Sequence, residues 1–385
     1  MDILLVGSSF SAAPMLFDLK RRGTHVTVVG KHEDDPCHAY ADNSIYIDYS
    51  DPAELLEVCR TRDFMGIVPS CNDYAYVAAA KVAATLGYPG FDTLDIVEIL
   101  HEKDRFRQFC ASIGVPAPRI YGEVTVEAKS VKVHIPGSAL VKPVDSFSGR
   151  GVERVHDSDY LPAAIDRALA QSRNKRAVVE EFVDGDLHSH TAFIAGSEIV
   201  WHEFVDEFCE TYPYQVDRSA YPSALTVSLR TEVHESLTSI VRALGLVDGL
   251  LHTQFIASKD SFWIIECMRR CPGDLYSQHF QLAAGQDYTH EYVSPFLGLA
   301  PKAPVSQKTL RRVERQVIST EGPQAFFGVS FNTGARPATF IPLKKSGEKL
   351  APAPFDKAGI LFLEGRDGED PACPFAANIS RTVQH

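Results

Sequence analysis

The sequence lacks the features that place proteins in membranes, outside the cell or on nucleic acid. No apolar run approaches the roughly 20 residues that span a bilayer, and the start, Met1–Gly7, is typical of a short strand rather than a signal sequence. The eight cysteines form no CxxC pair, so they indicate neither a zinc site nor a disulfide framework. No Lys/Arg tract occurs and the net charge is −12, which disfavours nucleic acid. We expect a cytoplasmic protein with neither a membrane nor a nucleic-acid partner.

Several widespread catalytic signatures are also missing. The segment Gly7–Ser11 lacks the second and third glycines of GxGxxG, so close backbone approach to a dinucleotide pyrophosphate is not provided for. No GK[ST] sequence of a Walker A loop is present, and no Ser/His/Asp signature occurs. These absences disfavour nicotinamide or flavin chemistry, P-loop nucleotide binding and hydrolysis by an activated serine.

The first hundred residues alternate short apolar runs with segments of helical spacing. The apolar runs include Ile3–Val6, His25–Val29 and Gly66–Pro69. This repetition predicts a parallel sheet with helices on both faces. Two of the runs end in small polar residues, Ser8-Ser9 and Ser70–Asp73. We expect a ligand near these residues, because ligands of such sheets bind beyond the carboxyl ends of the strands.

The 385-residue chain is long enough for two or three domains, and its character changes near residue 96. A charged helix, Ile96–Ile113, precedes strands at Ala139–Lys142 and Ala177–Phe182, and beyond about 303 strand-like segments with many Pro and Gly follow. We predict an α/β protein, α+β in its middle part. Its predicted units are a parallel βαβ domain over 1–95, a domain with the functional site over 96–302, and a β-rich region over 303–385.

The most informative stretch is WIIECMRRCPG, Trp263–Gly273. It indicates a buried strand whose end brings Glu266, Arg269 and Arg270 together before a glycine turn. Charge of both signs at a strand end is what a site for a metal ion and phosphate oxygens requires. A surface ion pair at a strand terminus is the alternative interpretation.

Two further segments have the composition of a nucleotide site. KPVDSFSGRGV, Lys142–Val152, places a lysine at a strand end before a loop of serines and glycines. Small residues let backbone N–H groups wrap phosphate oxygens, and the lysine supplies a point charge. VVEEFVDG, Val178–Gly185, is a strand that runs into a turn, and its backbone edge suits a purine ring. A plain turn and a strand that leaves the core are the alternative interpretations of the two segments.

The order of these motifs along the chain resembles that of the ATP-grasp superfamily, most closely its carboxylate–amine ligases. The motifs are Lys103 on a helix, Lys142 with its Ser/Gly loop, Glu180-Glu181, and Glu266 with Arg270. The resemblance covers about residues 96–300, and such ligases carry a βαβ domain in front. It implies ATP and Mg²⁺ as cofactors and small-molecule substrates. The implied reaction activates a carboxylate as an acyl phosphate and joins it to an amine with release of ADP. A homodimer is the assembly that the resemblance implies.

The resemblance also assigns roles to particular residues. The implied nucleotide contacts are Lys103 and Lys142 at the phosphates, Ser146, Ser148, Gly149 and Gly151 in a lid, and Glu180, Glu181, Phe182 and Val183 at the adenine edge. Glu266 would hold Mg²⁺. Arg270, with Arg269 beside it and Lys142, would serve catalysis.

Three positions depart from the family pattern. Where many members have a Glu for the ribose, this chain offers His188 one residue on. The upstream metal carboxylate falls on Gln254, and the usual Asn two residues after Glu266 is Met268, a poor ligand for Mg²⁺. Asp274, just past the turn, is the candidate to make up the deficit. The departures leave three possibilities: one metal fewer, an altered site, or a chain that binds nucleotide without catalysis.

Other questions stay open in the sequence. A carboxylase-type enzyme that activates bicarbonate, and an ATP-binding module with an impaired metal site, are the competing functions. His188 and His190 share one side of a strand, where a transition-metal pair competes with nucleotide contact or plain surface. We expect Asp206–Leu225 to be a long loop. Its candidates for contact with the second substrate, against a solvated loop face, are Asp206, Glu207, Arg218 and Tyr221. No motif names the substrates.

Overall fold

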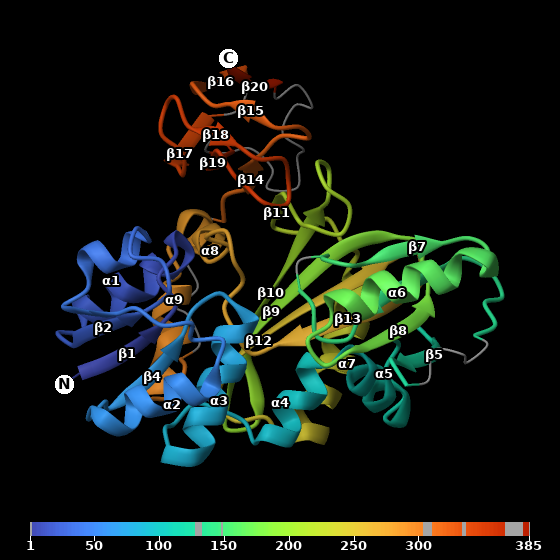
Figure 1. Cartoon of the computed structure of the whole chain (residues 1–385), viewed down its shortest axis with the longest axis horizontal. Helices are drawn as coiled ribbons and strands as arrows, with labels where there is room; N and C mark the ends of the chain where they lie inside the picture. Colours follow the sequence, from blue (N-terminus) through green and yellow to red (C-terminus); the bar gives the residue numbers. More distant parts are fainter. Residues whose placement is uncertain are drawn as a thin grey trace.

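The computed structural model describes residues 2–127, 133–147, 149–302, 310–332, 336–365 and 380–384. Ser148 of the predicted lid lies outside the described residues, as does the start of the predicted C-terminal region at 303. Figure 1 shows an N-terminal unit in blue, a green lobe, long central strands and a C-terminal lobe in red. Among the described residues, no helix has both the length and the apolar composition needed to cross a membrane.

The N-terminal unit is built on a four-stranded parallel sheet in the order β3-β2-β1-β4. Its strands are β1 (Asp2–Val6), β2 (His25–Val29), β3 (Asn43–Ile45) and β4 (Gly66–Pro69). The other elements are η1 (Phe10–Ala12), α1 (Ala13–Arg21), η2 (Pro36–Tyr40), α2 (Pro52–Thr61) and α3 (Asp73–Leu86). Buried apolar strands alternate with helices, which confirms the predicted βαβ class.

Two helices, α4 (Leu94–His101) and α5 (Lys103–Ser112), replace the single charged helix predicted over Ile96–Ile113. The backbone leaves helical geometry at Glu102, with φ −98° and ψ 118°. The prediction was wrong because helical spacing continues across the break. As a consequence, Lys103 begins α5, and its backbone N–H donates to the carbonyl of Val144, 3.2 Å away after β6.

The green lobe is a four-stranded antiparallel sheet in the order β5-β8-β6-β7, with one helix packed on it. Its elements are β5 (Ile120–Thr125), β6 (Ala139–Pro143), β7 (Glu153–Val155), η3 (Ser158–Tyr160), α6 (Leu161–Gln171) and β8 (Arg176–Glu181). Apolar side chains of the sheet and of α6, among them Val141 and Ile165, form its core. The lobe carries the two predicted nucleotide segments, which begin at Lys142 on β6 and Val178 on β8.

The central sheet is antiparallel throughout and runs in the order β13-β12-β9-β10-β11-β14-β19-β17. Its strands are β9 (Asp186–Ala195), β10 (Glu198–Phe208), β11 (Arg218–Tyr221), β12 (Gly249–Ala257), β13 (Phe262–Met268), β14 (Val313–Ile318), β17 (Arg336–Pro342) and β19 (Gly359–Glu364). One face packs against α7 (Val227–Leu244). The other packs against α8 (Gln278–Ala284) and α9 (Tyr288–Val293), which η4 (Ser294–Leu297) follows.

The chain beyond residue 310 is rich in β-structure in its described part. Three of its strands, β14, β17 and β19, extend the central sheet. Two short pairs complete it: β15 (Gln324–Ala325) with β18 (Lys349–Leu350), and β16 (Gly328–Asn332) with β20 (Ser380–Gln384). The C-terminal lobe is therefore continuous with the sheet that carries Glu266.

The segment Asp206–Leu225, predicted to be a long loop, is a loop only in part. β10 continues to Phe208 and pairs with β11 at Arg218–Tyr221, which leaves 209–217 between them. The prediction was wrong because the charges in this segment have partners inside the fold. Glu207 is buried and accepts from the hydroxyl of Ser219, 2.6 Å away on the neighbouring strand.

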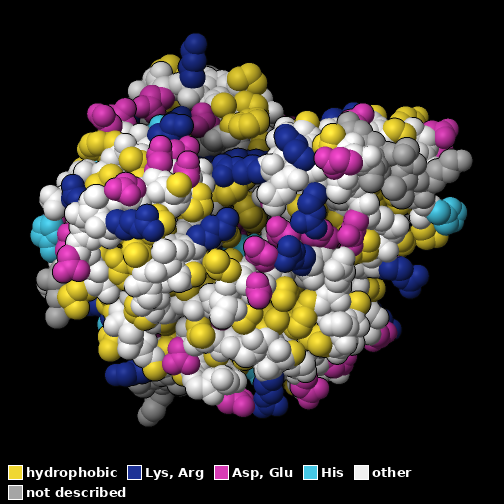
Figure 2. All heavy atoms as spheres, turned by 60° about the horizontal axis from the view of Figure 1, so that its bottom comes forward, with side chains coloured by type: hydrophobic (Ala, Val, Ile, Leu, Met, Phe, Trp, Pro, Cys, Tyr) yellow, Lys and Arg dark blue, Asp and Glu magenta, His cyan; other side chains and the backbone are white. Residues whose placement is uncertain are grey.

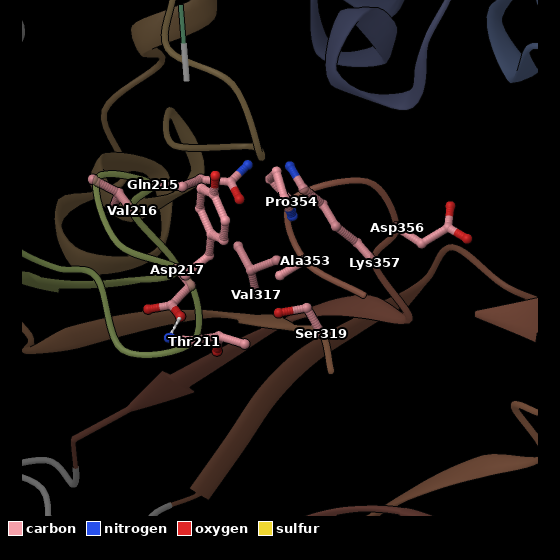
Figure 3. A pocket seen from close by; sticks show the side chains of 11 residues that line it. Thr211, Gln215, Val216, Asp217, Val317, Ser319, Ala353, Pro354, Asp356 and Lys357 are labelled. Carbon is pink, nitrogen blue, oxygen red and sulfur yellow. Dashed lines mark hydrogen bonds between the residues drawn. The ribbon is translucent and has the colours of Figure 1, made fainter. Parts of the chain in front are cut away.

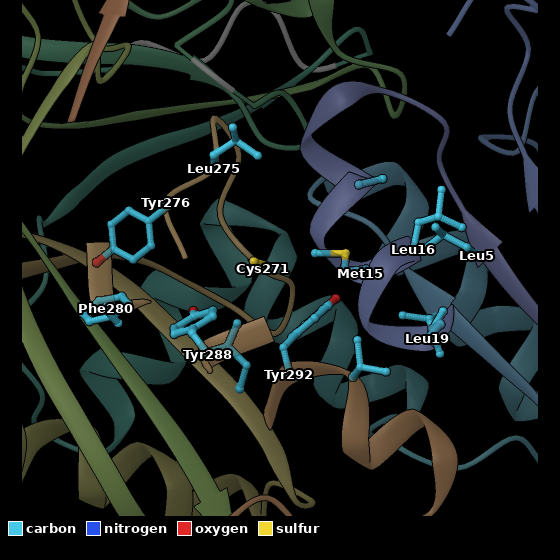
Figure 4. Close-up of a cluster of buried hydrophobic side chains, with 14 of the residues drawn as sticks. Leu5, Met15, Leu16, Leu19, Cys271, Leu275, Tyr276, Phe280, Tyr288 and Tyr292 are labelled. Carbon is cyan, nitrogen blue, oxygen red and sulfur yellow. The ribbon is translucent and has the colours of Figure 1, made fainter. Parts of the chain in front are cut away.

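One hydrophobic cluster joins the N-terminal sheet to the rest of the chain. Figure 4 shows Leu5 on one side of it, Tyr276 on the other and Cys271 between them. The phenol of Tyr292 on α9 donates to the carbonyl of Pro69 at the end of β4, 2.8 Å away. This packing holds the carboxyl ends of β1 and β4 against the turn that follows β13.

Candidate functional site

Glu180, near the end of β8, is fully buried between two cations. Its carboxylate accepts from the ammonium of Lys142 on β6 and from Nε of Arg107 on α5, the latter at 3.1 Å. Burial acts to raise the pKa of Glu180, but the charges of Arg107 and Lys142 outweigh it and the pKa is lowered. Arg107 also donates to the carbonyl of Ile265, 2.5 Å away on β13. The green lobe is thereby tied to the strand that carries Glu266.

Lys103 is the second lysine of the site. Its ammonium donates to the carbonyl of Ser146, 2.5 Å away, and lies 5.5 Å from the centre of the Phe147 ring. Desolvation lowers the pKa of Lys103; Lys142 adds to this effect and Glu266 opposes it. Two lysines from different elements thus act on each other, and an anion with several charged oxygens would relieve their repulsion.

Glu266 and Gln254 lie directly opposite each other on β13 and β12. Opposed residues of an antiparallel pair share a face, so the carboxylate and the amide lie together, both partly exposed. Met268, two residues on, belongs to the same face and is buried. The two oxygen-bearing groups fit one Mg²⁺, which takes hard oxygen ligands and keeps several waters, whereas the thioether does not fit.

Arg270 reaches from the end of β13 to the N-terminal unit. Its Nη2 donates to Oδ2 of Asp73, 2.7 Å away at the start of α3. For Asp73, burial acts to raise the pKa, but Arg270 lowers it, and Asp73 raises the pKa of Arg270 against the effect of its burial. Nδ1 of His101 lies 3.7 Å from Oδ1 of Asp73, and burial lowers the pKa of His101 to about 4. The site therefore contains a charged pair and a neutral imidazole at the end of β4.

Of these groups, Asp73, His101, Lys103, Glu266 and Met268 line one cleft. Its lining residues are Asp73, Leu100, His101, Lys103, Phe106, Phe147, Ile265, Glu266, Cys267 and Met268. On the face drawn in Figure 2, side chains of both charges gather around a central recess. The cleft combines apolar walls with two carboxylates and an ammonium, the mixture expected of a pocket for a small charged ligand.

The predicted lid, Ser146–Gly151, follows the end of β6. Oγ of Ser146 donates to the carbonyl of Arg150, 2.8 Å away. Gly149 has φ +70°, and a Cβ there would come within 2.7 Å of the carbonyl oxygen of Tyr214. Glycine avoids both the left-handed strain and this contact. Gly151 is also left-handed, at φ +72°, so the turn depends on both glycines.

Of the four residues predicted at the adenine edge, Glu181 is the last residue of β8, and Phe182 and Val183 follow it directly. The backbone N–H of Glu181 donates to the carbonyl of Arg119, 2.8 Å away, and Val183 is buried. The guanidinium of Arg154 covers the ring of Phe182 at 3.5 Å. Their contact with adenine stays a prediction.

Arg269 has a structural position rather than the predicted catalytic one. It is buried, and its Nε donates to Oδ2 of Asp92 at 2.7 Å. Its other nitrogens donate to the carbonyls of Leu250 and Val247, at 2.7 and 2.6 Å. A guanidinium used in this way has no free edge for a substrate, so we do not carry Arg269 forward as a catalytic residue.

We expect Arg269→Ala to lower the free energy of unfolding by about 3–5 kcal/mol, because it leaves the Asp92 carboxylate buried without a partner. Urea unfolding of the purified variant measures this. The matched control is Arg242→Ala, which breaks an exposed pair with Glu198 and should cost at most about 1 kcal/mol. Equal losses in the two variants would contradict the structural assignment.

Two other predicted site residues, Asp274 and Glu180, form ion pairs inside the protein. The predicted metal ligand Asp274 accepts from the ammonium of Lys357, 2.5 Å away. Burial acts to raise its pKa, but Lys357 and Arg315 lower it, so the carboxylate is already neutralised by cations of the C-terminal lobe. Glu180, predicted at the adenine edge, is fully buried and both of its oxygens are bound by Lys142 and Arg107. We therefore assign it to positioning Lys142.

His188, predicted at the ribose, lies on the face of the central sheet opposite Glu266. It pairs across the strands with Phe255, whereas Gln254 pairs with Ser189, and successive residues of a strand point to opposite faces. Its Nδ1 lies 2.9 Å from Oδ1 of Asp206, and its ring stacks on Phe255 at 5.5 Å. We do not retain it as a nucleotide contact.

Sequence reasoning missed Arg107, Asp73 and Phe147. Arg107 lies four residues after Lys103, one helical turn away on the same face, and that spacing could have indicated it. Asp73 ends the polar segment after β4 that was expected near a ligand, but its partner Arg270 could not be foreseen. Phe147 packs edge-on against Tyr74 of α3, with ring centres 5.2 Å apart, so the lid contacts the N-terminal unit.

A second, shallow pocket lies between the 211–217 loop and the C-terminal lobe (Figure 3). Its lining includes Gln215, Val317 and Lys357, and it shares no residue with the cleft at Glu266. The loop is held by Asp217, whose carboxylate accepts from the backbone N–H of Thr211 at 2.6 Å. We place the chemistry at the cleft, because Lys103 and Glu266 line it and the charge of Lys142 acts on Lys103.

Comparison with known proteins finds distant relatives that share one enzyme name. No protein-family model matches the chain. The formate-dependent phosphoribosylglycinamide formyltransferase of Rhodococcus jostii is 26% identical over 279 residues, which cover 70% of this chain and 68% of that enzyme. The enzyme of the same name from Prochlorococcus marinus is 27% identical over 257 residues, with 63% of each chain covered.

Solved structures show the same fold. L-amino acid ligase from Bacillus licheniformis superposes with a TM-score of 0.76 at 18% identity, and covers 94% of this chain and 93% of that one. Phosphoribosylglycinamide synthetase from Anaerococcus prevotii superposes with a TM-score of 0.73 at 16% identity, with the same coverage of the two chains. N5-carboxyaminoimidazole ribonucleotide synthetase from Thermotoga maritima superposes with a TM-score of 0.66 at 17% identity. The superposition covers 95% of this chain and 94% of that one.

The relatives support an ATP-dependent, ADP-forming ligase that activates a carboxylate as an acyl phosphate. The relatives and the solved structures support the resemblance to ATP-grasp carboxylate–amine ligases that the sequence predicted. The cofactors of the chain are ATP and Mg²⁺. Small molecules are its substrates.

Proposed function

We propose that this ligase joins a small carboxylic acid to an amine that carries an anionic group, and that the chemistry takes place between Lys103, Lys142 and Glu266. The observation that carries the proposal is that Lys103 lines one cleft with the Glu266 carboxylate, and that the charges of Glu266 and Lys142 both act on Lys103. Lys142 and Lys103 would neutralise the phosphates of ATP. Glu266 and Gln254 would hold Mg²⁺, which supplies positive charge at the transferring phosphoryl group.

The reaction needs this arrangement because a carboxylate is a poor acyl donor in water. A carboxylate oxygen attacks the γ-phosphorus of ATP, the bond to the bridging oxygen breaks, and ADP leaves. The amine then attacks the acyl carbon, the carbon–oxygen bond breaks, and phosphate departs while the amine loses a proton. Arg270 is bound to Asp73, which lines the cleft, and its charge would stabilise the oxyanion of the second step. The Phe147 side of the lid would exclude water from the acyl phosphate.

The amine is proposed to be anionic because cations converge beyond Arg270. Asp274 follows the turn, and the positive charges that act on it come from Lys357, Arg315 and Arg270. Arg270 also pairs with Asp73 and Arg315 also acts on Glu207, so a phosphate or carboxylate of the substrate would share these cations with carboxylates of the protein. The named substrates of the relatives, formate and phosphoribosylglycinamide, have this chemistry: one is a small acid and the other an amine with a phosphate.

An assay of ADP release with MgATP tests the proposal, run against a matrix of small acids and amines. Formate, bicarbonate and amino acids serve as acids, and phosphorylated and carboxylated amines as acceptors. We expect ADP release that needs one acid and one amine together and is lost in Glu266→Gln. Release with bicarbonate and no amine would indicate a carboxylase-type enzyme instead. ATP binding without turnover in any mixture would indicate a binding module.

Three further assignments accompany the proposal. The units 1–95, 96–302 and 303–385 remain our division of the chain, although β14, β17 and β19 join the central sheet. We keep the homodimer as the expected assembly, which sedimentation velocity measures. The cytoplasm remains the expected compartment, in keeping with small charged substrates.

A further inference from the structure

Three histidines meet on the face of the central sheet that packs against α7. His190 on β9 and His202 on β10 share this face, because His202 pairs with Ala192, two residues from His190. His234 reaches them from α7, and its ring stacks on that of His202 with centres 4.1 Å apart. One ring nitrogen from each histidine lies within 4.8 Å of the other two.

The ring nitrogens of this cluster lack protein partners. His190 is fully buried, yet neither of its nitrogens has a hydrogen bond to any residue that the structure describes. Nδ1 of His202 and Nδ1 of His234 are buried without a partner in the same way. An unsatisfied buried polar group costs about 1–3 kcal/mol, so four such atoms at one place need a ligand that accounts for them.

We propose that His190, His202 and His234 bind one zinc-class transition-metal ion. Neutral imidazole is a preferred ligand of such ions. Zn–N bonds of about 2.0–2.1 Å place the nitrogens of a tetrahedral centre about 3.4 Å apart, so the rings need to close by no more than about 1.4 Å. His202 and His234 are partly exposed, which gives an ion access from solvent. The fourth position would be filled by water.

The electrostatics of the cluster agree with metal binding. Burial lowers the pKa of His190 well below its usual range and that of His202 to about 4. Burial also lowers the pKa of His234, against the charge of Glu235. The three imidazole rings are therefore neutral at pH 7. Each ring has a nitrogen lone pair that can bind a metal ion without first losing a proton. The face opposite carries Glu266, so the ion would fasten α7 to the sheet and take no part in the reaction.

The test uses metal-stripped, untagged protein with excess Mg²⁺ in every sample, so that Glu266 does not take up the added metal. Zn²⁺ and Co²⁺ are titrated separately. We expect one Zn²⁺ per chain after gel filtration, a visible spectrum of tetrahedral Co²⁺, and a raised thermal midpoint with Zn²⁺. His202→Gln and His234→Ala should each weaken Zn²⁺ binding at least about 100-fold.

His134→Gln changes an exposed histidine of the green lobe and is the matched control, expected to bind Zn²⁺ like wild type. His234 is a partly exposed helix residue, so its replacement by alanine should leave the fold intact, which the thermal midpoint without metal verifies. Wild type that retains no Zn²⁺ would overturn the proposal. Equal retention by wild type and both cluster variants would also overturn it.

Discussion

Lys142→Gln is expected to lower ADP release by about 10²- to 10³-fold, the loss that follows removal of one charged group from a developing anion. The ammonium of Lys142 is bound to the buried Glu180 carboxylate and acts on Lys103, and it is the charge that would move to the phosphates when ATP binds. Glutamine keeps a hydrogen-bond donor for Glu180, which Arg107 still neutralises. The variant should therefore stay folded. Initial rates at saturating MgATP measure the effect.

Two comparisons separate a catalytic loss from a structural one. Lys259→Gln removes an exposed lysine from the turn between β12 and β13 and should leave the rate unchanged. The thermal midpoint of Lys142→Gln should stay near that of wild type. If Lys142→Gln released ADP at the wild-type rate, the assignment of Lys142 to the phosphates would be wrong.

Glu266→Gln is the second change with a large expected effect, again about 10²- to 10³-fold in turnover. It removes the only carboxylate of the Glu266–Gln254–Met268 group and leaves Mg²⁺ with two neutral amides. ATP binding itself should weaken far less, because Lys103 and Lys142 remain. Turnover measured across a range of Mg²⁺ concentrations, beside ATP binding by calorimetry, gives both quantities. Glu321→Gln, at an exposed position, is the matched control.

The reverse change tests the departures from the family pattern. Gln254→Glu combined with Met268→Asn restores hard ligands on both sides of Glu266. We expect the Mg²⁺ concentration for half-maximal turnover to fall by about tenfold, since a second carboxylate faces the ion. If the double variant required more Mg²⁺ than wild type, Gln254 would not be a metal neighbour.

The sequence predicted the parts of the site that are local in the chain. Each of these parts lies within one short segment of the sequence, so residue pattern and spacing indicate it. The parts are the lysine at the end of β6, the glycine lid after it, and the charged end of β13. The fold class followed from the same local patterns, because strand and helix periods differ. Gln254 and Glu266 could be related because they lie on two consecutive strands.

The pairs that hold the site together could not be predicted, because their members are far apart in sequence. Arg107 and Glu180 are 73 residues apart, and Asp92 and Arg269 are 177 apart. Nothing in either segment of such a pair marks its partner. This is why Arg269 was predicted to be catalytic and Glu180 was predicted at adenine: both have the residue type of a site, and only the fold shows that their charges are already paired.

The histidine cluster illustrates the same limit. His188 and His190 were considered as a metal pair, and the third ligand was missing because it comes from another helix. The structure replaces that pair with His190, His202 and His234, from two strands and α7. His188 instead lies against Asp206. Strand alternation predicted the face correctly, but only packing brings a helix residue to it.

Transfer of oxygen from the acid to phosphate tests the central claim most directly. The acid that supports ADP release is labelled with ¹⁸O in its carboxylate, and the phosphate product is examined by ³¹P NMR. An acyl phosphate requires that one carboxylate oxygen leave with the phosphorus, so we predict one ¹⁸O in each phosphate released. Phosphate without ¹⁸O, formed at the same rate as ADP, would mean that water attacks ATP and would contradict the assignment as a carboxylate–amine ligase.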